Sequence, residues 1–419
     1  MLRKVISKVK SQEHFSNFLI YGFGQGFNLI TPLLVIPYII FICGLEKYGK
    51  AAFGMALTFF LIVFIDYGSD ILGVKLIATN RHDHDKLEKV FTTTYSSKII
   101  VLAIVLVIMS IVFTTIPYFS KDLMLYMLGL PILFGQFLNP TWFLQGVENF
   151  VQITILNILS KIIYLTGIFM FIREENDFVY INLWWGIGMI AANGISLIYI
   201  LHRYRFNFTS VTLSDIKENL KNGFSIFSSQ IFVSIQLYSP LILVGFIGNG
   251  LMAGMYRIVE QVVAVFKTYI LLFFNFVYPR VCYLLAQDVA KGRKFWLTFN
   301  GANFIFILIS MIGVFVLADP IMKYFDPKAT SEVSQLLRIA VAIPLLMAVS
   351  IPLKQLVLGF DFNSFYVKWT VISVVSTVVI IILLLPVFHL KGVLFSLIMV
   401  EFLTAILFFL KIKKRLFLP

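Results

Sequence analysis

Stretches of about twenty mostly apolar residues recur along the whole chain, and short polar segments separate them. A helix of that length spans the roughly 30 Å hydrocarbon core of a membrane. Only helices satisfy their backbone hydrogen bonds within one such run, and the runs lack the strict alternation of barrel strands. The pattern therefore predicts an all-α integral membrane protein with about twelve transmembrane helices. We expect these helices at residues 16–42, 51–74, 97–118, 123–146, 151–172, 178–201, 223–247, 251–279, 295–318, 334–358, 364–388 and 392–410.

A polar segment in the middle of the chain divides the predicted helices into two sets of six. This segment, residues 202–222, contains TLSDIKENLKNG, whose leucine and isoleucine residues have the spacing of one helix face. We therefore expect a short amphipathic helix in a cytoplasmic linker. The expected domains are an N-terminal bundle at 1–201, the linker at 202–222 and a C-terminal bundle at 223–419.

The two halves of the chain also resemble each other in sequence. Offsets of 208 and 213 residues bring prolines, glycines and polar residues of the two halves into register. The matched pairs are Asn28 with Gln236, Pro32 with Pro240, Tyr48 with Tyr256, Pro131 with Pro344, Gly146 with Gly359, and Glu148 with Asp361. Because each half has an even number of helices, the repeats should be parallel and enclose a central cavity, as in alternating-access transporters.

Composition agrees with a membrane protein. Hydrophobic residues make up 59% of the chain and charged residues 13%, whereas a soluble domain has about 25% charged residues. A soluble protein of this composition is therefore excluded.

The net charge of +13 is unevenly distributed between the two sides of the predicted helices. The side of the N-terminus carries 21 Lys and Arg residues, and the opposite side carries 7. Loops rich in Lys and Arg stay in the cytoplasm, so both termini are expected there. The basic balance is therefore a topology signal, and no nucleic-acid partner is expected.

The sequence lacks the features of an enzyme or a metal protein. Cys43 and Cys282 fall at opposite ends of their predicted helices, so no disulfide is expected between them. His82 and His84 lie in a polar loop without the spacing of a metal site. The longest external loop covers only 319–333, which is short for an enzyme that acts on external glycans. We expect no enzyme activity, no metal and no cofactor.

Several motifs resemble those of one transporter family. NPTWFLQGVENF at 139–150 is similar to a Pro-x-Trp-x-x-Gln-Gly-x-Glu signature, the most specific of the set. QGFNLITPLLVIPYIIFICGLEKYG at 25–49, FIDYGSDILGVKLIATNR at 64–81, MYRIVEQ at 255–261 and VYPR at 277–280 fit further elements. Together they resemble bacterial polysaccharide flippases of the Wzx type, in the multidrug/oligosaccharidyl-lipid/polysaccharide (MOP) exporter superfamily.

The resemblance implies a MATE-like fold of two six-helix bundles in the cytoplasmic (inner) membrane. It implies a flippase that moves an undecaprenyl-diphosphate-linked oligosaccharide, such as an O-antigen repeat unit, to the outer leaflet by alternating access. Coupling to a proton or sodium gradient is expected. Expected partners besides this glycan are membrane lipids, a glycan polymerase and a chain-length regulator.

Some charged side chains lie deep in the predicted helices, where each costs about 2.5–3.5 kcal/mol at the bilayer centre. Lys161 and Lys267, with Arg257 nearer the outer side, are cations suited to attracting a diphosphate. Gln25 and Asn28 share a face of the first predicted helix. We expect these five residues to line the substrate-binding and translocation site.

Three deep carboxylates are candidates for binding the coupling ion: Asp66, Glu260 and Glu401. The sequence does not choose among them. The alternative for all these charges is a structural role in buried ion pairs, for example between Arg257 and Glu260 one helical turn apart.

The nearest alternative function is a cation-coupled multidrug exporter of the same superfamily, whose cavity would be lined by carboxylates. The deep lysines and the motif around Trp142 favour the flippase. A major-facilitator carrier would need an acidic-basic signature between its second and third helices, and a peptidoglycan-precursor flippase usually has two more helices. A membrane enzyme or a scaffold is disfavoured by the short loops and by the charges at depth.

Overall fold

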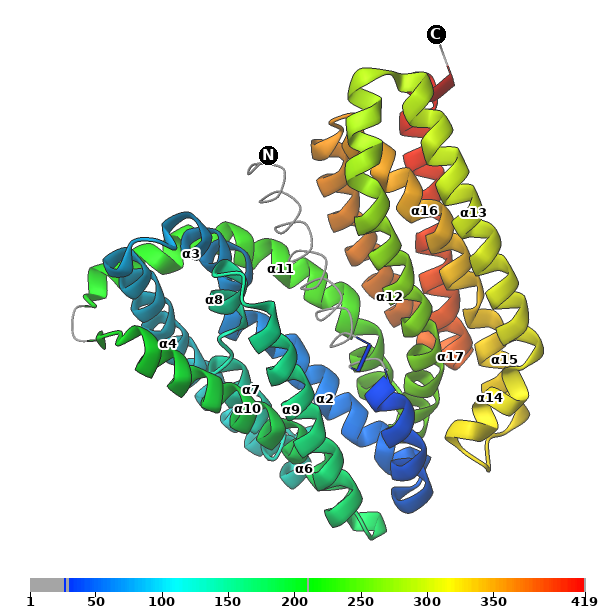
Figure 1. Cartoon of the computed structure of the whole chain (residues 1–419). Coiled ribbons are helices and arrows are strands. Elements are labelled where there is room, and N and C mark those ends of the chain that lie inside the picture. Colours follow the sequence, from blue (N-terminus) through cyan, green and yellow to red (C-terminus); the bar gives the residue numbers. More distant parts are fainter. Residues whose placement is uncertain (1–25, 28–29, 209–210, 418–419) are drawn as a thin grey trace. The chain divides into compact units, whose positions relative to one another are not determined.

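The computed structural model of the chain describes residues 26–27, 30–208 and 211–417, and all regular elements within them are helices (Figure 1). Within these residues, ten helical segments are long and apolar enough to cross a membrane, and a shorter apolar helix covers Ile30–Cys43. The prediction of an all-α membrane protein is confirmed. The count of twelve helices and the cytoplasmic position of both termini stay predictions.

The chain is divided into two compact units. Unit 1 comprises Met1–Gly44 and Ala51–Tyr238, and unit 2 comprises Leu45–Lys50 and Ser239–Pro419. Two helices therefore pass from one unit into the other, and each is continuous at that point: α2 (Leu45–Asp66) and α11 (Leu213–Ile247).

The expected amphipathic helix of the linker is the first part of α11. This helix begins at Leu213 and continues through Gly223, where the sequence suggested an end. Glycine weakens a helix interior by only about 1 kcal/mol relative to alanine, so packing can carry a long helix through it. The predicted domain boundaries around 202–222 stay predictions.

Unit 1 contains the following elements between α2 and α11: η1 (Ser69–Gly73), α3 (Val74–Asn80), α4 (His84–Thr115), α5 (Pro117–Ser120), α6 (Leu123–Met127), α7 (Pro131–Phe137), α8 (Thr141–Gly146), α9 (Phe150–Phe171), η2 (Glu175–Tyr180) and α10 (Ile181–Tyr204). An aromatic cluster lies in its core, where the ring centroid of Phe91 is 5.9 Å from that of Trp142 and 5.2 Å from that of Phe143. A Cβ at Gly73 would lie 2.7 Å from Trp142 Cε3. The tryptophan of the 139–150 motif therefore packs tightly in the core of unit 1.

The span predicted at 123–146 is divided into three short helices, α6, α7 and α8. Pro131 is the first residue of α7, and Pro140 immediately precedes α8. Proline lacks the amide hydrogen that a continuing helix would need, so it favours breaks at these positions.

Two other helices bind carbonyl groups of this interrupted span. Asn193 Nδ2 of α10 donates to the Gly135 carbonyl oxygen at 2.8 Å, and Tyr95 Oη of α4 donates to the Leu138 carbonyl oxygen at 3.4 Å. Non-helical backbone is tolerated at membrane depth only where protein or water satisfies it. The side chains of Asn193 and Tyr95 therefore satisfy two carbonyl groups of the span that its helix breaks would otherwise leave without a partner.

Unit 2 contains the end of α11 and six further helices: α12 (Gly250–Gln287), α13 (Val289–Val316), α14 (Ala318–Phe325), α15 (Ser331–Ala340), α16 (Ala342–Gly359) and α17 (Asn363–Phe417). α12 packs against α13 and α16, and α16 packs against α17 (Figure 1). Buried aliphatic residues of α12 and α16 form a core cluster with Ala405, Phe408 and Ile412 of α17.

α17 consists of two helices joined at His389, whose φ of 51° and ψ of −140° are not helical. The junction separates the two spans that the sequence predicts at 364–388 and 392–410. Asn363–Lys413 counts as one of the ten membrane-crossing segments although it contains both of these helices.

The first turns of α2 pack very closely against α12 within unit 2. A Cβ on Gly49 would lie 1.8 Å from the Gly250 carbonyl oxygen, and a Cβ on Gly254 would lie 2.4 Å from the Leu45 carbonyl oxygen. Gly250 and Gly254 form a GxxxG pair, which lets two helix backbones approach closely in a membrane. This contact explains why Leu45–Lys50 belongs to unit 2.

The turn that follows α8 in unit 1 recurs after α16 in unit 2. Glu148 and Asp361, which the 213-residue offset aligns, have left-handed backbones with φ of 62° and 61°. In both turns the amide of the next residue donates to a carbonyl oxygen of the preceding helix, at 2.8 Å in unit 1 and 3.0 Å in unit 2. The two turns therefore have the same backbone geometry, and the repeat over the whole chain stays a prediction.

The glycines before these acidic residues are also in corresponding positions. A Cβ on Gly146 would lie 2.5 Å from Ile77 Cβ, and a Cβ on Gly359 would lie 3.0 Å from Leu285 Cδ1. Ile77 and Leu285 are themselves matched by the 208-residue offset. In unit 1 the end of α8 therefore packs on Ile77 of α3, and in unit 2 the end of α16 packs on the matched residue, Leu285 of α12.

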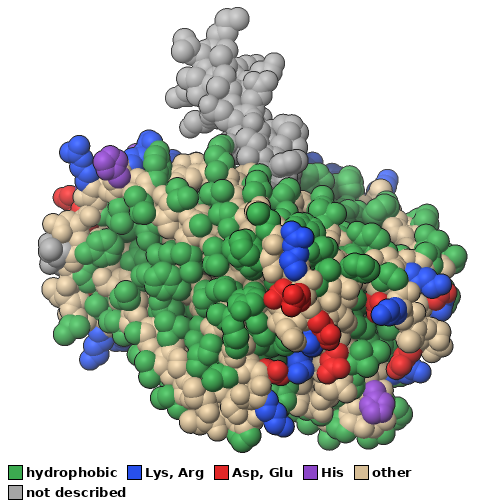
Figure 2. Space-filling view, turned by 90° about the horizontal axis from the view of Figure 1, so that it is seen from below, with side chains coloured by type: hydrophobic (Ala, Val, Ile, Leu, Met, Phe, Trp, Pro, Cys, Tyr) green, Lys and Arg blue, Asp and Glu red, His purple; other side chains and the backbone are tan. Residues whose placement is uncertain are grey.

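Large apolar side chains are exposed along many helices, and Figure 2 shows hydrophobic side chains over much of one face, with charged side chains gathered in a few groups. Examples are Ile198 of α10 at 69% exposure and Val316 of α13 at 66%. Apolar area of this extent is unfavourable in water and favourable in lipid. The surface therefore agrees with a multi-pass membrane protein.

Candidate functional site

A cavity of about 330 Å³ in unit 1 is lined by Lys161, one of the predicted site residues. α9 contributes Lys161 and Asn157 to its wall, and α10 contributes Trp185 and Asn193. Asn139 lies in the loop before α8 and completes a lining that is rich in side-chain amides. The cavity can therefore offer both a cation and several hydrogen-bonding groups to one ligand.

Lys161 has an aromatic partner in place of an anionic one. Its Nζ lies 3.3 Å from the centroid of the Trp185 ring, and the residue is only 9% exposed. Phe59 and Tyr164 pack edge-on against Trp185, at centroid distances of 5.5 and 4.9 Å, and fix the orientation of its ring. A cation–π contact of this kind contributes up to about 2 kcal/mol when it is desolvated.

No carboxylate among the described residues forms an ion pair with Lys161. Burying an ammonium group is costly unless an opposite charge compensates it. The cation–π contact offsets part of that cost. In its protonated form, Lys161 would offer an anion that enters the cavity a charge without a carboxylate partner among the described residues.

Two of the cavity's amides are partly used by the protein itself. Asn193 donates to the Gly135 carbonyl oxygen, and Asn139 donates to Gln136 Oε1 while it accepts from the Thr141 amide. These bonds hold the side chains in place and leave other lone pairs and hydrogens available to a ligand.

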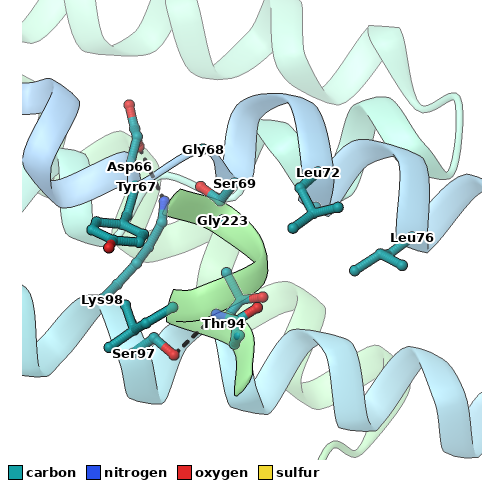
Figure 3. A pocket seen from close by; sticks show the side chains of 13 residues that line it. Asp66, Tyr67, Gly68, Ser69, Leu72, Leu76, Thr94, Ser97, Lys98 and Gly223 are labelled. Atoms are coloured by element: carbon teal, nitrogen blue, oxygen red, sulfur yellow. Dashed lines mark hydrogen bonds and ion pairs between the residues drawn. The ribbon is translucent and has the colours of Figure 1, made fainter. Parts of the chain in front are cut away.

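Asp66 lies at the end of α2 in an ion pair that the sequence analysis did not identify (Figure 3). Lys98 of α4 is 2% exposed, and its Nζ lies 3.1 Å from Asp66 Oδ1. Gln136 of α7 donates to both oxygens of Asp66, at 3.0 and 2.8 Å. The carboxylate is therefore paired with a cation of α4 and hydrogen-bonded by α7.

A second carboxylate, Asp70, lies one turn beyond Asp66 on the π-helical segment η1. Both line a cavity of about 120 Å³ together with Gln230, Ser234 and Tyr238 of α11. Gln230 Nε2 donates to Asp70 Oδ2 at 2.6 Å. The sequence analysis missed Asp70, although its spacing from Asp66 next to Gly68 could have indicated a pair.

Three cavities of unit 1 have common walls. Asp66 and Gly68 line both the cavity of Figure 3 and the Asp70 cavity. Phe59, Ile62 and Tyr238 line both the Asp70 cavity and the Lys161 cavity. The three adjoining cavities therefore connect the Asp66–Lys98 pair to Lys161 through polar groups, all of them in unit 1.

In unit 2 the predicted site residues are already partnered. Arg257 Nη1 lies 2.8 Å from Glu260 Oε2, and Tyr48 forms a further side-chain hydrogen bond with Arg257. Glu401 of α17 accepts a hydrogen bond from the Ser350 hydroxyl of α16. The ion pair between Arg257 and Glu260 is the one that their helical spacing suggested.

Lys267 of α12 and Lys354 of α16 both lie in unit 2. Each is close enough to Glu401 for its charge to interact with the carboxylate. Lys267 thus has an acidic neighbour, whereas Lys161 has none among the described residues. Gln25 and Asn28 lie outside the described residues. The structure also has no group of three or more His, Cys, Asp or Glu side chains in the described part of the chain that could hold a metal ion.

Comparison with known sequences identifies a family. The family described as "Polysaccharide biosynthesis protein" matches residues 15–284. A protein of Escherichia coli (strain K12), named "Putative O-antigen transporter", is 25% identical over 268 residues, which are 64% of this chain and 65% of that protein. A protein of Shigella dysenteriae with the same name is 22% identical over 281 residues, which are 67% of this chain and 70% of that protein. The matched region thus spans slightly less than two thirds of the E. coli relative.

Comparison with solved structures shows the fold. A structure described as the lipid II flippase MurJ in an inward closed conformation has a TM-score of 0.76 at 14% identity, covering 94% of this chain and 87% of that one. An inward-facing multidrug resistance MATE family transporter of the MOP superfamily has a TM-score of 0.74 at 15% identity, covering 92% and 94%. The family match and the shared fold confirm the resemblance that the motifs indicated, and the ten long apolar helices in the described part of the chain agree with a multi-pass membrane protein.

Proposed function

Because the chain belongs to the polysaccharide biosynthesis protein family, we propose that it is a flippase for undecaprenyl-diphosphate-linked oligosaccharide. The substrate would move from the inner to the outer leaflet of the cytoplasmic membrane. The names of the two bacterial relatives support an O-antigen repeat unit as the glycan. The fold, which a lipid II flippase and a MATE transporter have in common, supports movement by alternating access.

The observation that carries this proposal is the uncompensated charge of Lys161. A lipid-linked diphosphate is an anion that must leave the headgroup region and cross an apolar core. A buried ammonium group resting on an aromatic ring can exchange that contact for a stronger one with phosphate. Lysine is a point charge on a flexible stem, so it can follow a moving diphosphate more easily than arginine can.

The other groups of the Lys161 cavity fit a glycan. Side-chain amides and hydroxyls hydrogen-bond sugar hydroxyls, and aromatic rings pack against the apolar faces of sugars. Lys267 and Arg257 would attract the diphosphate at other stages of transport, and Gln25 and Asn28 would contact the glycan. The polyprenyl tail would remain in lipid.

Coupling to a proton or sodium gradient would drive the cycle, and Asp66, Glu260 and Glu401 are the carboxylates predicted to bind the ion. A glycan polymerase and a chain-length regulator would then use the flipped substrate. The protein would itself make no covalent change to the glycan.

The direct test is complementation of a deletion strain, with surface glycan as the readout. We expect Lys161→Ala to reduce glycan display by roughly 10- to 100-fold, because a charge-assisted contact contributes about 1.5–3 kcal/mol. Lipid-linked oligosaccharide should accumulate in the cytoplasmic leaflet of the variant, which separates a transport defect from a synthesis defect.

Two controls define the result. Lys368→Ala removes an exposed lysine of α17 and should leave display unchanged, and Lys161→Arg keeps the charge and should retain part of it. Normal display by Lys161→Ala, at normal levels in the membrane, would exclude the cationic cavity as the substrate site. Normal display by the deletion strain itself would refute the proposed function.

The likeness to MATE transporters also supports one rival, a cation-coupled multidrug exporter. An uncompensated lysine in the cavity would repel the organic cations that such a protein exports. Expression of the protein in a drug-sensitive strain should therefore not raise the minimal inhibitory concentration of cationic dyes. A severalfold rise that depends on Glu260 or Glu401 would favour the exporter.

A further inference from the structure

The segment that carries Asp70 has an unusual backbone. α2 ends at Asp66, and the next two residues, Tyr67 and Gly68, have left-handed φ values of 43° and 79°. The π-helix η1 follows directly and carries Asp70 on its first turn. π-Helical turns are rare and occur frequently at functional sites.

The charges around Asp70 do not balance. Asp66 is neutralised by Lys98, and Gln136 supplies hydrogen bonds to both Asp66 oxygens. Asp70 receives neutral hydrogen bonds from Gln230 and from its own backbone amide, and no ion pair with it is found among the described residues. With both carboxylates ionised, the described residues around the cavity would therefore carry one negative charge that the ammonium group does not balance.

Oxygen atoms suitable for a cation surround this charge. The amide nitrogen of Gln230 faces Asp70, which leaves the Gln230 side-chain oxygen available, and each carboxylate oxygen of Asp70 has more than one lone pair. Ser234 follows Gln230 on the same face of α11 and lines the same cavity. Carboxylate, amide and hydroxyl oxygens are the ligands that hard cations prefer.

A second observation points to a ligand in this region. Ser69, the residue before Asp70, is 7% exposed, and its Oγ has no hydrogen-bond partner among the described residues. Its side chain lines the adjoining cavity beside the Asp66–Lys98 pair (Figure 3). A buried hydroxyl without a partner costs about 1–3 kcal/mol, which a bound ion or its water could recover.

We propose that Asp70 and Gln230 hold a monovalent cation, Na⁺ or a proton, between η1 and α11. One uncompensated carboxylate matches one positive charge. A cavity of about 120 Å³ also has room for an ion with a few water molecules, since each water occupies about 30 Å³ of liquid. As the coupling-ion site this rests on the proposed function; as a cation site it does not. Asp70 then takes the role that the sequence offered to Asp66, Glu260 and Glu401.

Position also favours Asp70 as the site that communicates with the Lys161 cavity. Tyr238 of α11 lines both cavities and lies on the helix that carries Gln230 and Ser234. A cation between η1 and α11 would hold these two elements together. Occupancy would therefore act on a wall of the Lys161 cavity through one continuous helix.

The test measures cation binding to the purified full-length protein in nanodiscs, without any transport assay. Thermal unfolding is followed during titration with NaCl, with choline chloride as the ionic-strength control, and separately over pH in choline chloride. The wild type should show a saturable rise in unfolding temperature. Sodium dependence identifies Na⁺, and dependence on pH alone identifies a proton.

Asp70→Asn keeps the shape and the hydrogen bond to Gln230 but removes the charge, so the response should disappear. If Asp70→Asn does not accumulate, Asp70→Glu keeps the carboxylate and should shift the midpoint by about tenfold or more, the change expected for roughly 1.4 kcal/mol. Glu332→Gln, an exposed residue of unit 2, should respond like the wild type.

A response that survives in Asp70→Asn, or that is lost instead in Glu260→Gln or Glu401→Gln, would overturn the proposal. Absence of any cation response in the wild type would overturn it as well. Cation binding at Asp70 in a protein that fails to restore surface glycan would refute the proposed function and leave the site standing.

Discussion

Unit 1 and unit 2 have the same turn but treat their buried charges differently. After α8 and after α16, a glycine packed against a neighbouring helix is followed by an acidic residue with left-handed backbone. In unit 2 the deep charges Arg257, Glu260 and Glu401 have polar partners within the unit. In the described part of unit 1, Lys161 lies on an aromatic ring and Asp70 accepts neutral hydrogen bonds, and neither forms an ion pair.

The difference shows that two similar turns can lie in units whose buried charges have different partners. The groups that make the turn are in corresponding positions, whereas Lys161 and Asp70 have no counterparts with the same chemistry at either offset. Depth in the membrane does not separate functional charges from structural ones. Compensation by the protein is the criterion we propose for ranking them, because a charge without an opposite partner leaves more binding energy for a ligand.

The largest effect should follow from breaking a compensated charge in unit 1. Asp66→Leu leaves Lys98 unpaired at 2% exposure, which should destabilise the protein by about 3–5 kcal/mol. Thermal unfolding in detergent should show a strongly lowered midpoint and reduced accumulation in the membrane.

The double variant Asp66→Leu/Lys98→Met should recover most of that stability, since an apolar pair of similar volume can replace a buried ion pair. Lys161→Met serves as the contrasting control and should keep its stability, because it removes a charge without leaving an anion unpaired. If Lys161→Met were as unstable as Asp66→Leu, the distinction between compensated and uncompensated charges would be wrong.

An intermediate loss of stability should follow from alanine substitutions at Gly146 and Gly359, and its size should differ between these two equivalent glycines. A Cβ at Gly146 meets Ile77 Cβ and Cγ2 at 2.5 Å with the Val74 carbonyl oxygen behind, so Gly146→Ala should cost about 1–3 kcal/mol. A Cβ at Gly359 meets the end of the Leu285 side chain at 3.0 Å and Cys282 Sγ at an ordinary 3.8 Å, so Gly359→Ala should cost less.

The lowering of the unfolding temperature by each alanine variant measures this difference. Gly301→Ala is the matched control, because a Cβ there meets nothing within 4 Å. Equal effects at Gly146 and Gly359 would mean that the two turns are packed alike, contrary to their geometry.

The smallest effect should be a gain in stability at the acidic residues of the turns. A non-glycine residue in the left-handed region costs roughly 1 kcal/mol, which Glu148→Gly and Asp361→Gly would relieve. Glu148→Gly also removes an exposed ion pair with Arg81, which contributes about 0–1 kcal/mol. The rise in unfolding temperature should therefore be smaller for Glu148→Gly than for Asp361→Gly.

Much of the fold could be predicted from the sequence. Long apolar runs specify helices in lipid because the backbone has no alternative partner, and the offsets of 208 and 213 residues located a turn that the structure repeats. The pair of Arg257 and Glu260 followed from helical spacing alone. Prolines at 131 and 140 were visible, but an unbroken apolar run around them concealed the division into α6, α7 and α8.

The partners of the deep charges could not be predicted. Asp66 and Lys98 are 32 residues apart and Asp70 and Gln230 are 160 apart, so their pairing depends on how the helices are rotated against each other. One residue turns a helix by about 100°, and an apolar run without a polar stripe does not fix that rotation. Lys161 was recognised because its depth is a local property, whereas its partner Trp185 became known only from the packing of α9 on α10.

The interrupted span Leu123–Gly146 has a consequence for how the protein is made. The carbonyl group of Gly135 receives its hydrogen bond from Asn193, which is synthesised 58 residues later. At roughly 5–20 residues per second, about 3–12 s pass before that amide leaves the ribosome. During this interval the span would be poorly suited to release into bulk lipid. The insertion machinery should therefore keep the nascent span at its lateral exit until α10 arrives, and the first bundle should enter the bilayer as a group.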